Sequence, residues 1–127
     1  MPNEQAESLD AILAADKNRP AIVLIHCPTD TLPGFQTDPD LFLVNGTHRY
    51  RDTMHKILDK HARVRAVLSG HVHFNSTSRY ANRRIHQTLA SFIEYPFQIR
   101  VIEIEGSSIT SRMLALATDQ DVETVFG

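Results

Sequence analysis

The stretch Val64-Arg65-Ala66-Val67-Leu68-Ser69-Gly70-His71-Val72-His73 decides the fold expected for this chain of 127 residues. Its first part is apolar apart from Arg65, which predicts a buried strand over residues 64–69. Two histidines at positions i and i+2 of an extended chain face the same side. Gly70 before them would loosen the backbone, so that both histidines could turn inward toward a metal ion.

A second apolar run, Ala21-Ile22-Val23-Leu24-Ile25-His26-Cys27-Pro28, also ends in a histidine. It predicts a strand over residues 21–27. Because its apolar residues do not alternate with polar ones, both faces of this strand should be covered, as in a parallel or mixed sheet. We expect the two strands to end on the same edge of one sheet, which would bring His26 close to His71 and His73.

Helical periodicity occupies two other segments. Residues 4–15 and 50–61 repeat apolar side chains at helical spacing. The expected buried positions are Ala6, Leu9, Ile12 and Leu13 in the first helix and Tyr50, Met54, Ile57, Leu58 and His61 in the second. The order helix, strand, helix, strand predicts a layered α/β arrangement.

The rest of the chain changes character after residue 73. Four strands are predicted, over residues 74–80, 83–89, 97–104 and 109–116, without helices between them, so this part should be largely antiparallel. Residues 28–48 show no periodicity and predict either a substrate-facing segment or a surface loop, and residues 118–127 predict an acidic surface tail. The expected fold class is therefore α/β (mixed α+β), one domain over residues 1–127 with a mixed sheet, two helices and an antiparallel C-terminal portion.

The composition of the chain argues against several classes of function. The net charge of −2 gives no electrostatic case for binding nucleic acid or an anionic membrane surface. No run approaches the roughly 18 to 20 apolar residues that span a bilayer, and the first residues lack the pattern of a signal peptide. The single cysteine, Cys27, excludes an internal disulfide and predicts a cytoplasmic location.

His26-Cys27-Pro28 and Gly70-His71-Val72-His73, in this order, resemble the last two motifs of the calcineurin-like metallophosphoesterases, H-x-P and G-H-x-H. Among these, the chain looks most like the cyclic-nucleotide phosphodiesterases. The resemblance implies the second half of a four-layer α/β/β/α sandwich. It also implies that His26 and His71 bind one divalent ion and His73 another, with manganese, iron or zinc as the ions. In that family the ions bind the phosphate oxygens of a phosphoester substrate and activate water for attack on phosphorus.

The family's first three motifs, D-x-H, G-D-x-x-D and G-N-H-[DE], do not precede His26, where the family order places them. The three histidines would then form a partial site, and the chain alone should be inactive. Three interpretations remain open. The chain is a phosphoesterase half whose first half is lost or supplied by another chain, a non-catalytic module for assembly or metal binding, or a small α/β protein with accidental motifs. A half-domain leaves apolar sheet surface open, so a homodimer or a complex with the missing half is expected.

Other polar residues fit no motif. Cys27 is predicted to be a small buried hydrophobic residue. The remaining histidines are predicted to lie on the surface or on a helix face: His48, His55, His61 and His86. Three arginines are expected on a solvated hairpin face: Arg79, Arg83 and Arg84.

Overall fold

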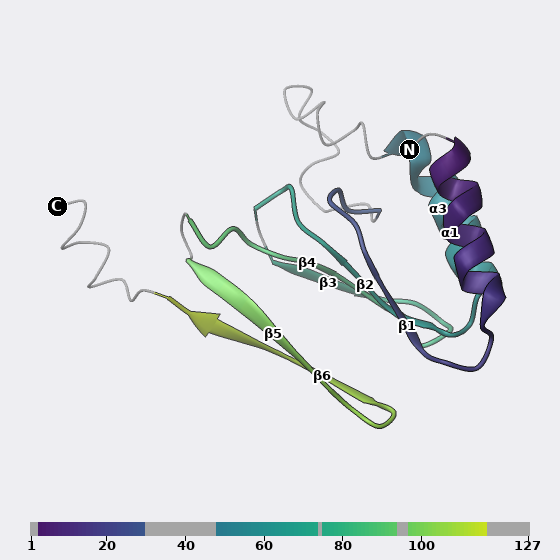
Figure 1. Cartoon of the computed structure of the whole chain (residues 1–127). Helices are drawn as coiled ribbons and strands as arrows, with labels where there is room; N and C mark the ends of the chain where they lie inside the picture. The colour runs from purple at the N-terminus through teal and green to yellow at the C-terminus, as the bar shows by residue number, and fades with distance from the viewer. Residues whose placement is uncertain (1–2, 30–47, 74, 94–96, 117–127) are drawn as a thin grey trace, which may run out of the picture.

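The computed structural model of the chain describes residues 3–29, 48–73, 75–93 and 97–116 (Figure 1). The elements are α1 (Asn3–Ala15), β1 (Ala21–Leu24), α3 (His48–Lys60), β2 (Val64–Ser69), β3 (Ser76–Arg79), β4 (Ile85–Thr88), β5 (Gln98–Glu105) and β6 (Ser108–Ala115). They form a mixed α/β structure with one mixed and one antiparallel sheet. Most of the loop expected over residues 28–48, and all of the tail expected over residues 118–127, lie outside the described residues.

The mixed sheet has the strand order β1-β2-β4-β3. β1 pairs with β2 in parallel, as the two apolar runs predicted, although β1 ends at Leu24 and is shorter than expected. β4 also pairs with β2 in parallel, and β3 lies antiparallel to β4 at the outer edge. The four strands after residue 73 were expected to be largely antiparallel, and β3 pairs with β4, and β5 with β6, in that way. The parallel position of β4 beside β2 was not predicted.

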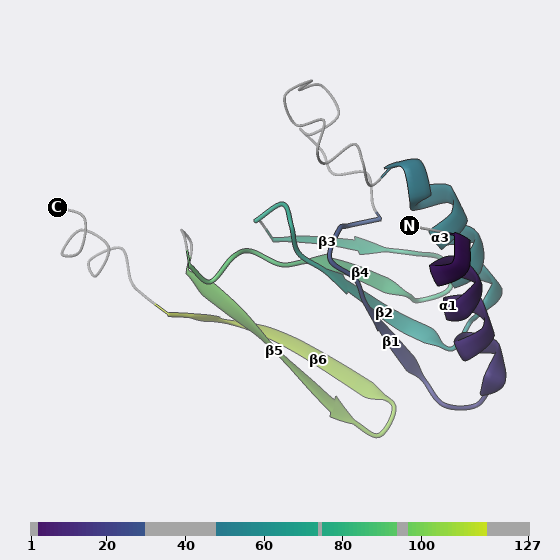
Figure 2. The same ribbon diagram turned by 45° about the horizontal axis from the view of Figure 1, so that its top comes forward.

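Both helices cover one face of this sheet, as the second view shows (Figure 2). The core between them consists of Leu13, Val23, Met54, Leu58, Val64 and Val67. The predicted face of α3 is confirmed by the buried side chains of Met54 and Leu58. Ile12, in contrast, was expected to be buried and is 66% exposed. Neighbouring helix positions are about 100° apart, so Ile12 lies to one side of the stripe centred on Leu13. None of the described helices has the length and apolar character needed to cross a membrane.

β5 and β6 form a separate antiparallel hairpin on the side of the mixed sheet opposite the helices (Figure 1). Its turn lies between Glu105 and Ser108, as predicted, and Gly106 adopts a φ of 58° there. Such left-handed conformations favour glycine in two-residue hairpin turns. Polar contacts connect the hairpin to the sheet: the Ser111 hydroxyl donates a hydrogen bond to Gln87 Oε1 at 3.0 Å.

Candidate metal site

The candidate site lies where β1 and β2 end, at one edge of the mixed sheet. Because the two strands are parallel neighbours, the residues that follow them emerge side by side. The Ile25 N–H donates a hydrogen bond to the Leu68 carbonyl, and the Gly70 N–H donates one to the His26 carbonyl, each at 3.0 Å. These bonds extend the strand pairing past the strand ends. They hold the backbone of His26 beside the backbone that carries His71.

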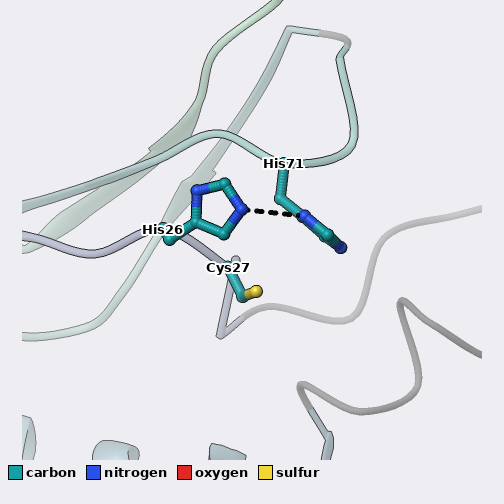
Figure 3. A group of neighbouring side chains, drawn as sticks. All are labelled: His26, Cys27 and His71. Atoms are coloured by element: carbon teal, nitrogen blue, oxygen red, sulfur yellow. Dashed lines mark hydrogen bonds between the residues drawn. The ribbon is translucent and has the colours of Figure 1, made fainter.

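The imidazoles of His26 and His71 meet at this edge (Figure 3). His71 Nδ1 lies 3.0 Å from His26 Nε2, and the rings are in an edge-to-face arrangement with centroids 4.8 Å apart. One of these nitrogens donates a hydrogen bond and the other accepts it, according to the tautomer of each ring. Both rings are accessible: His26 is exposed and His71 is half-buried. A metal ion could replace the shared proton as the bridge between the two nitrogens.

Cys27 completes a group of three potential ligands. The ligand atoms of His26, Cys27 and His71 all lie within 4.8 Å of one another. Cys27 is only half-buried and is not the buried hydrophobic residue that the sequence predicted. Burial raises the pKa of its thiol, so a metal ion that binds the sulfur must displace a proton. Sequence reasoning missed Cys27 because a free cysteine beside an apolar strand more often packs as a small buried hydrophobic residue than binds a metal.

The backbone of the G-H-x-H segment differs from expectation. Gly70 does not adopt a left-handed conformation, whereas His71 has a φ of 70° and His73 a φ of 58°. A left-handed conformation costs a residue other than glycine about 1–2 kcal/mol. Such strain is often found at functional sites, where the surrounding structure maintains it. The histidines themselves, and not the glycine, therefore make the turn that points His71 toward His26.

His73 is not part of the group formed by His26, Cys27 and His71. Its side chain is exposed. The left-handed φ values at His71 and His73 interrupt the alternation that would place the two side chains on one side. The role that the family resemblance gives to His73, as a ligand of a second ion, stays a prediction.

A buried polar network, which the sequence did not predict, anchors the chain just after the site. Arg84 is fully buried and His86 is 5% exposed, so their assignment to the surface was wrong. Arg84 Nε donates a hydrogen bond to His86 Nε2 at 2.8 Å, which requires that His86 carry its proton on Nδ1 and donate to the Thr29 hydroxyl at 3.2 Å. His55 Nε2 donates to the Thr29 carbonyl, also at 3.2 Å. Thr29 is thus held from two sides.

The other residues that were predicted to lie on the surface or on a helix face differ in their burial. Arg79 and Arg83 are exposed, as expected. His55 lies half-buried on α3, which agrees with a helix-face position, and the side chain of His48 lies outside the described residues. His61 is 9% exposed and pairs with Asp10, which agrees with its predicted place on the buried helix face.

One D-x-H tripeptide does occur in the chain, Asp59-Lys60-His61, at the end of α3. Its side chains are occupied elsewhere. Asp59 Oδ1 accepts a hydrogen bond from Arg84 at 2.9 Å, and Lys60 and His61 both contact Asp10. The two contacts with Asp10 stabilise the packing of α1 against the end of α3. The tripeptide therefore does not replace the missing first motif of the family.

The donor set fits one metal ion. Two imidazoles and a thiol are ligands that zinc accepts, and the group formed by His26, Cys27 and His71 contains no carboxylate that would favour manganese. No family model matches the chain, and no curated protein matches it.

Proposed function

We propose that this chain is the metal-binding second half of a metallophosphoesterase-type domain, which hydrolyses phosphoester bonds when a partner supplies the missing motifs. One observation carries the proposal: His26 and His71 follow two parallel neighbouring strands and bring their nitrogens to 3.0 Å. Two separate motifs, 45 residues apart, thereby converge in the order that the family resemblance requires. The finer fold assignment, half of a four-layer α/β/β/α sandwich, belongs to the same proposal.

Each of the three histidines has an expected role in metal binding. His26 and His71 hold one divalent ion, with manganese, iron or zinc as candidates, and His73 contributes to a second ion when the partner completes it. When bound, such ions supply Lewis-acid activation of a phosphoester and of water. The strained backbone at His71 fixes the direction of its ring before any ion binds. The group formed by His26, Cys27 and His71 contains no carboxylate, and we expect the chain to be inactive alone because the family's first three motifs do not precede His26.

The second chain, either a copy of this one or a chain with the missing half, covers apolar side chains that are exposed on the facing surfaces of the two sheets. Leu24 of β1 is 75% exposed, and its position beside the buried Val23 places it on the face away from the helices. Ile104 and Met113 share the hairpin face of Ser111, which contacts the mixed sheet, yet they are 63% and 45% exposed. Exposed apolar residues gathered in this way favour an interface. Burying them explains both a homodimer and a complex with the missing half.

The alternative function is a non-catalytic module for assembly or metal binding. The same exposed side chains favour it, because they support association without any chemistry. The free thiol of Cys27 is compatible with the reducing cytoplasm in either case. The two functions differ in one respect: only a phosphoesterase half gains hydrolysis when its first half is restored.

The test compares the purified chain with a complex in which a second chain carries the three missing motifs. Bis-p-nitrophenyl phosphate serves as substrate with added manganese, iron or zinc, and light scattering records the oligomeric state. We expect no turnover by the chain alone, metal-dependent turnover by the complex, and loss of turnover in His71→Ala.

Three outcomes would count against the proposal. Metal-dependent turnover by the purified chain, abolished in His71→Ala, would show that the site is complete without a partner. A folded complex that stays inactive with every metal would leave the assembly function as the better explanation. A monomer that persists at micromolar concentration would remove the argument from the exposed apolar side chains.

A further inference from the structure

The geometry points to Cys27 as the third ligand of the ion held by His26 and His71. We infer that this chain has its own site with two imidazoles and one thiolate, and that the site takes zinc in preference to manganese. The inference rests on the metal-binding part of the proposed function and is independent of hydrolysis. It differs from the expectation drawn from the family motifs, in which the histidines act without sulfur.

The distances are close to those of a tetrahedral site. Zinc binds imidazole nitrogen at roughly 2.0–2.1 Å and thiolate sulfur at roughly 2.3 Å, which separates two nitrogens by about 3.3 Å and a nitrogen from the sulfur by about 3.6 Å. His26 Nε2 and His71 Nδ1 are already 3.0 Å apart. The Cys27 sulfur lies within 4.8 Å of both ligand atoms. A small rotation about the Cα–Cβ bond of Cys27 moves the sulfur alone, so the backbone need not change.

The backbone around the three residues is fixed by its own contacts. Pro28, which follows Cys27, is fully buried, and Thr29 is held by His86 and His55. On the other segment, the Val72 N–H donates a hydrogen bond to the Gly70 carbonyl at 2.8 Å and closes a tight turn around His71. Both segments therefore present their ligands from anchored positions (Figure 3). An anchored ligand set loses little conformational freedom when the ion binds.

The chemistry of the donors decides the metal. Thiolate and imidazole together are a common zinc environment, whereas manganese and magnesium prefer carboxylate, carbonyl and water oxygens. Three protein ligands leave a fourth tetrahedral position for water or a substrate oxygen, as in catalytic zinc sites. The exposure of His26 keeps this position accessible from solvent. The ligand class is therefore a zinc-type cation that exchanges its fourth ligand.

Cobalt(II) is the probe for the test, because it takes the same tetrahedral site and reports sulfur ligation in its absorption spectrum. We expect the reduced wild-type chain to bind cobalt with a sulfur-to-cobalt charge-transfer band, which zinc then displaces. Cys27→Ser should lose the band and bind zinc at least about tenfold more weakly. Replacing a residue that only hydrogen-bonds to a metal ligand already lowers metal affinity by about tenfold or more, and Cys27 would be a ligand itself. Its ratio of zinc to manganese affinity should also fall.

His61→Gln is the matched control, because it removes a histidine that lies outside the group, before the start of β2. It should keep both the band and the zinc affinity, and His71→Ala should lose both. Circular dichroism checks that each variant is folded, and Cys27→Ala provides a second removal of the sulfur.

Three results would overturn the inference. The first is cobalt binding without a sulfur band, which would show a site of imidazoles only and leave the proposed function intact. The second is a loss of zinc affinity in folded His61→Gln equal to that in Cys27→Ser. The third is no binding of zinc or cobalt by the folded chain; the hydrolysis test on the completed complex then decides the proposed function separately.

Discussion

Replacing His86 by leucine is expected to lower the free energy of unfolding by about 3 kcal/mol, because it leaves a buried donor of a charged group, Arg84 Nε, without an acceptor. Arg84 has no exposed surface, and its Nε donates to His86 at 2.8 Å. A hydrogen bond to a charged group contributes about 1.5–3 kcal/mol, and the Thr29 hydroxyl loses its partner at a further cost of about 1 kcal/mol. Arg84 Nη1 already lacks a hydrogen-bond partner among the described residues, so no other hydrogen bond of the guanidinium offsets the loss at Nε.

Urea unfolding followed by circular dichroism measures the change, and the slope with denaturant should stay constant. The leucine side chain fills much of the imidazole volume, which keeps any cavity contribution small. Asp59→Asn is the matched control, since Asp59 accepts from the same guanidinium but its side chain is 65% exposed. It should cost less than His86→Leu, because asparagine keeps an oxygen that accepts the hydrogen bond from Arg84 Nη2. A loss below about 1 kcal/mol in His86→Leu, or an equal loss in Asp59→Asn, would refute the reasoning.

Two further predictions concern the termini of secondary-structure elements. A hydrogen bond from the Arg19 side chain, with two from backbone N–H groups, lowers the pKa of Asp16 from 3.8 to about 2, so its contribution to stability is complete above pH 3.8 and is lost as the pH falls toward 2. Asp16→Asn should therefore flatten the decline of the urea midpoint over that interval, and parallel declines in variant and wild type would contradict this. Gly106→Ala should cost about 1 kcal/mol because φ is 58° there, whereas Gly70→Ala, with ordinary φ and no atom within 4 Å of an added Cβ, should be nearly neutral. Thermal unfolding compares the two, and equal losses would show that the turn tolerates alanine.

Local sequence patterns determined most of the elements. The 3.6-residue spacing of Met54 and Leu58 located α3, and the apolar run around Val67 located β2. Gly106 marked the hairpin turn, because few other residues adopt its backbone conformation. The proximity of His26 and His71 was also predictable, since each follows an apolar run and parallel strands end at one edge. These features depend on neighbours in the sequence or on a rule that applies to any parallel pair.

Tertiary structure alone decided the rest. The buried side chains of β4 are polar. The sequence therefore has no alternation of apolar and polar residues there that would predict that His86 faces the helices or that β4 lies beside β2. Arg84 is buried where the residues before β4 contact Asp59 of α3, a contact between segments 25 residues apart. Cys27 joins the histidines, and His73 does not, because β1 ends early and two left-handed residues turn the other segment. Such choices depend on the balance of long-range contacts and local strain, which no periodicity in the sequence records.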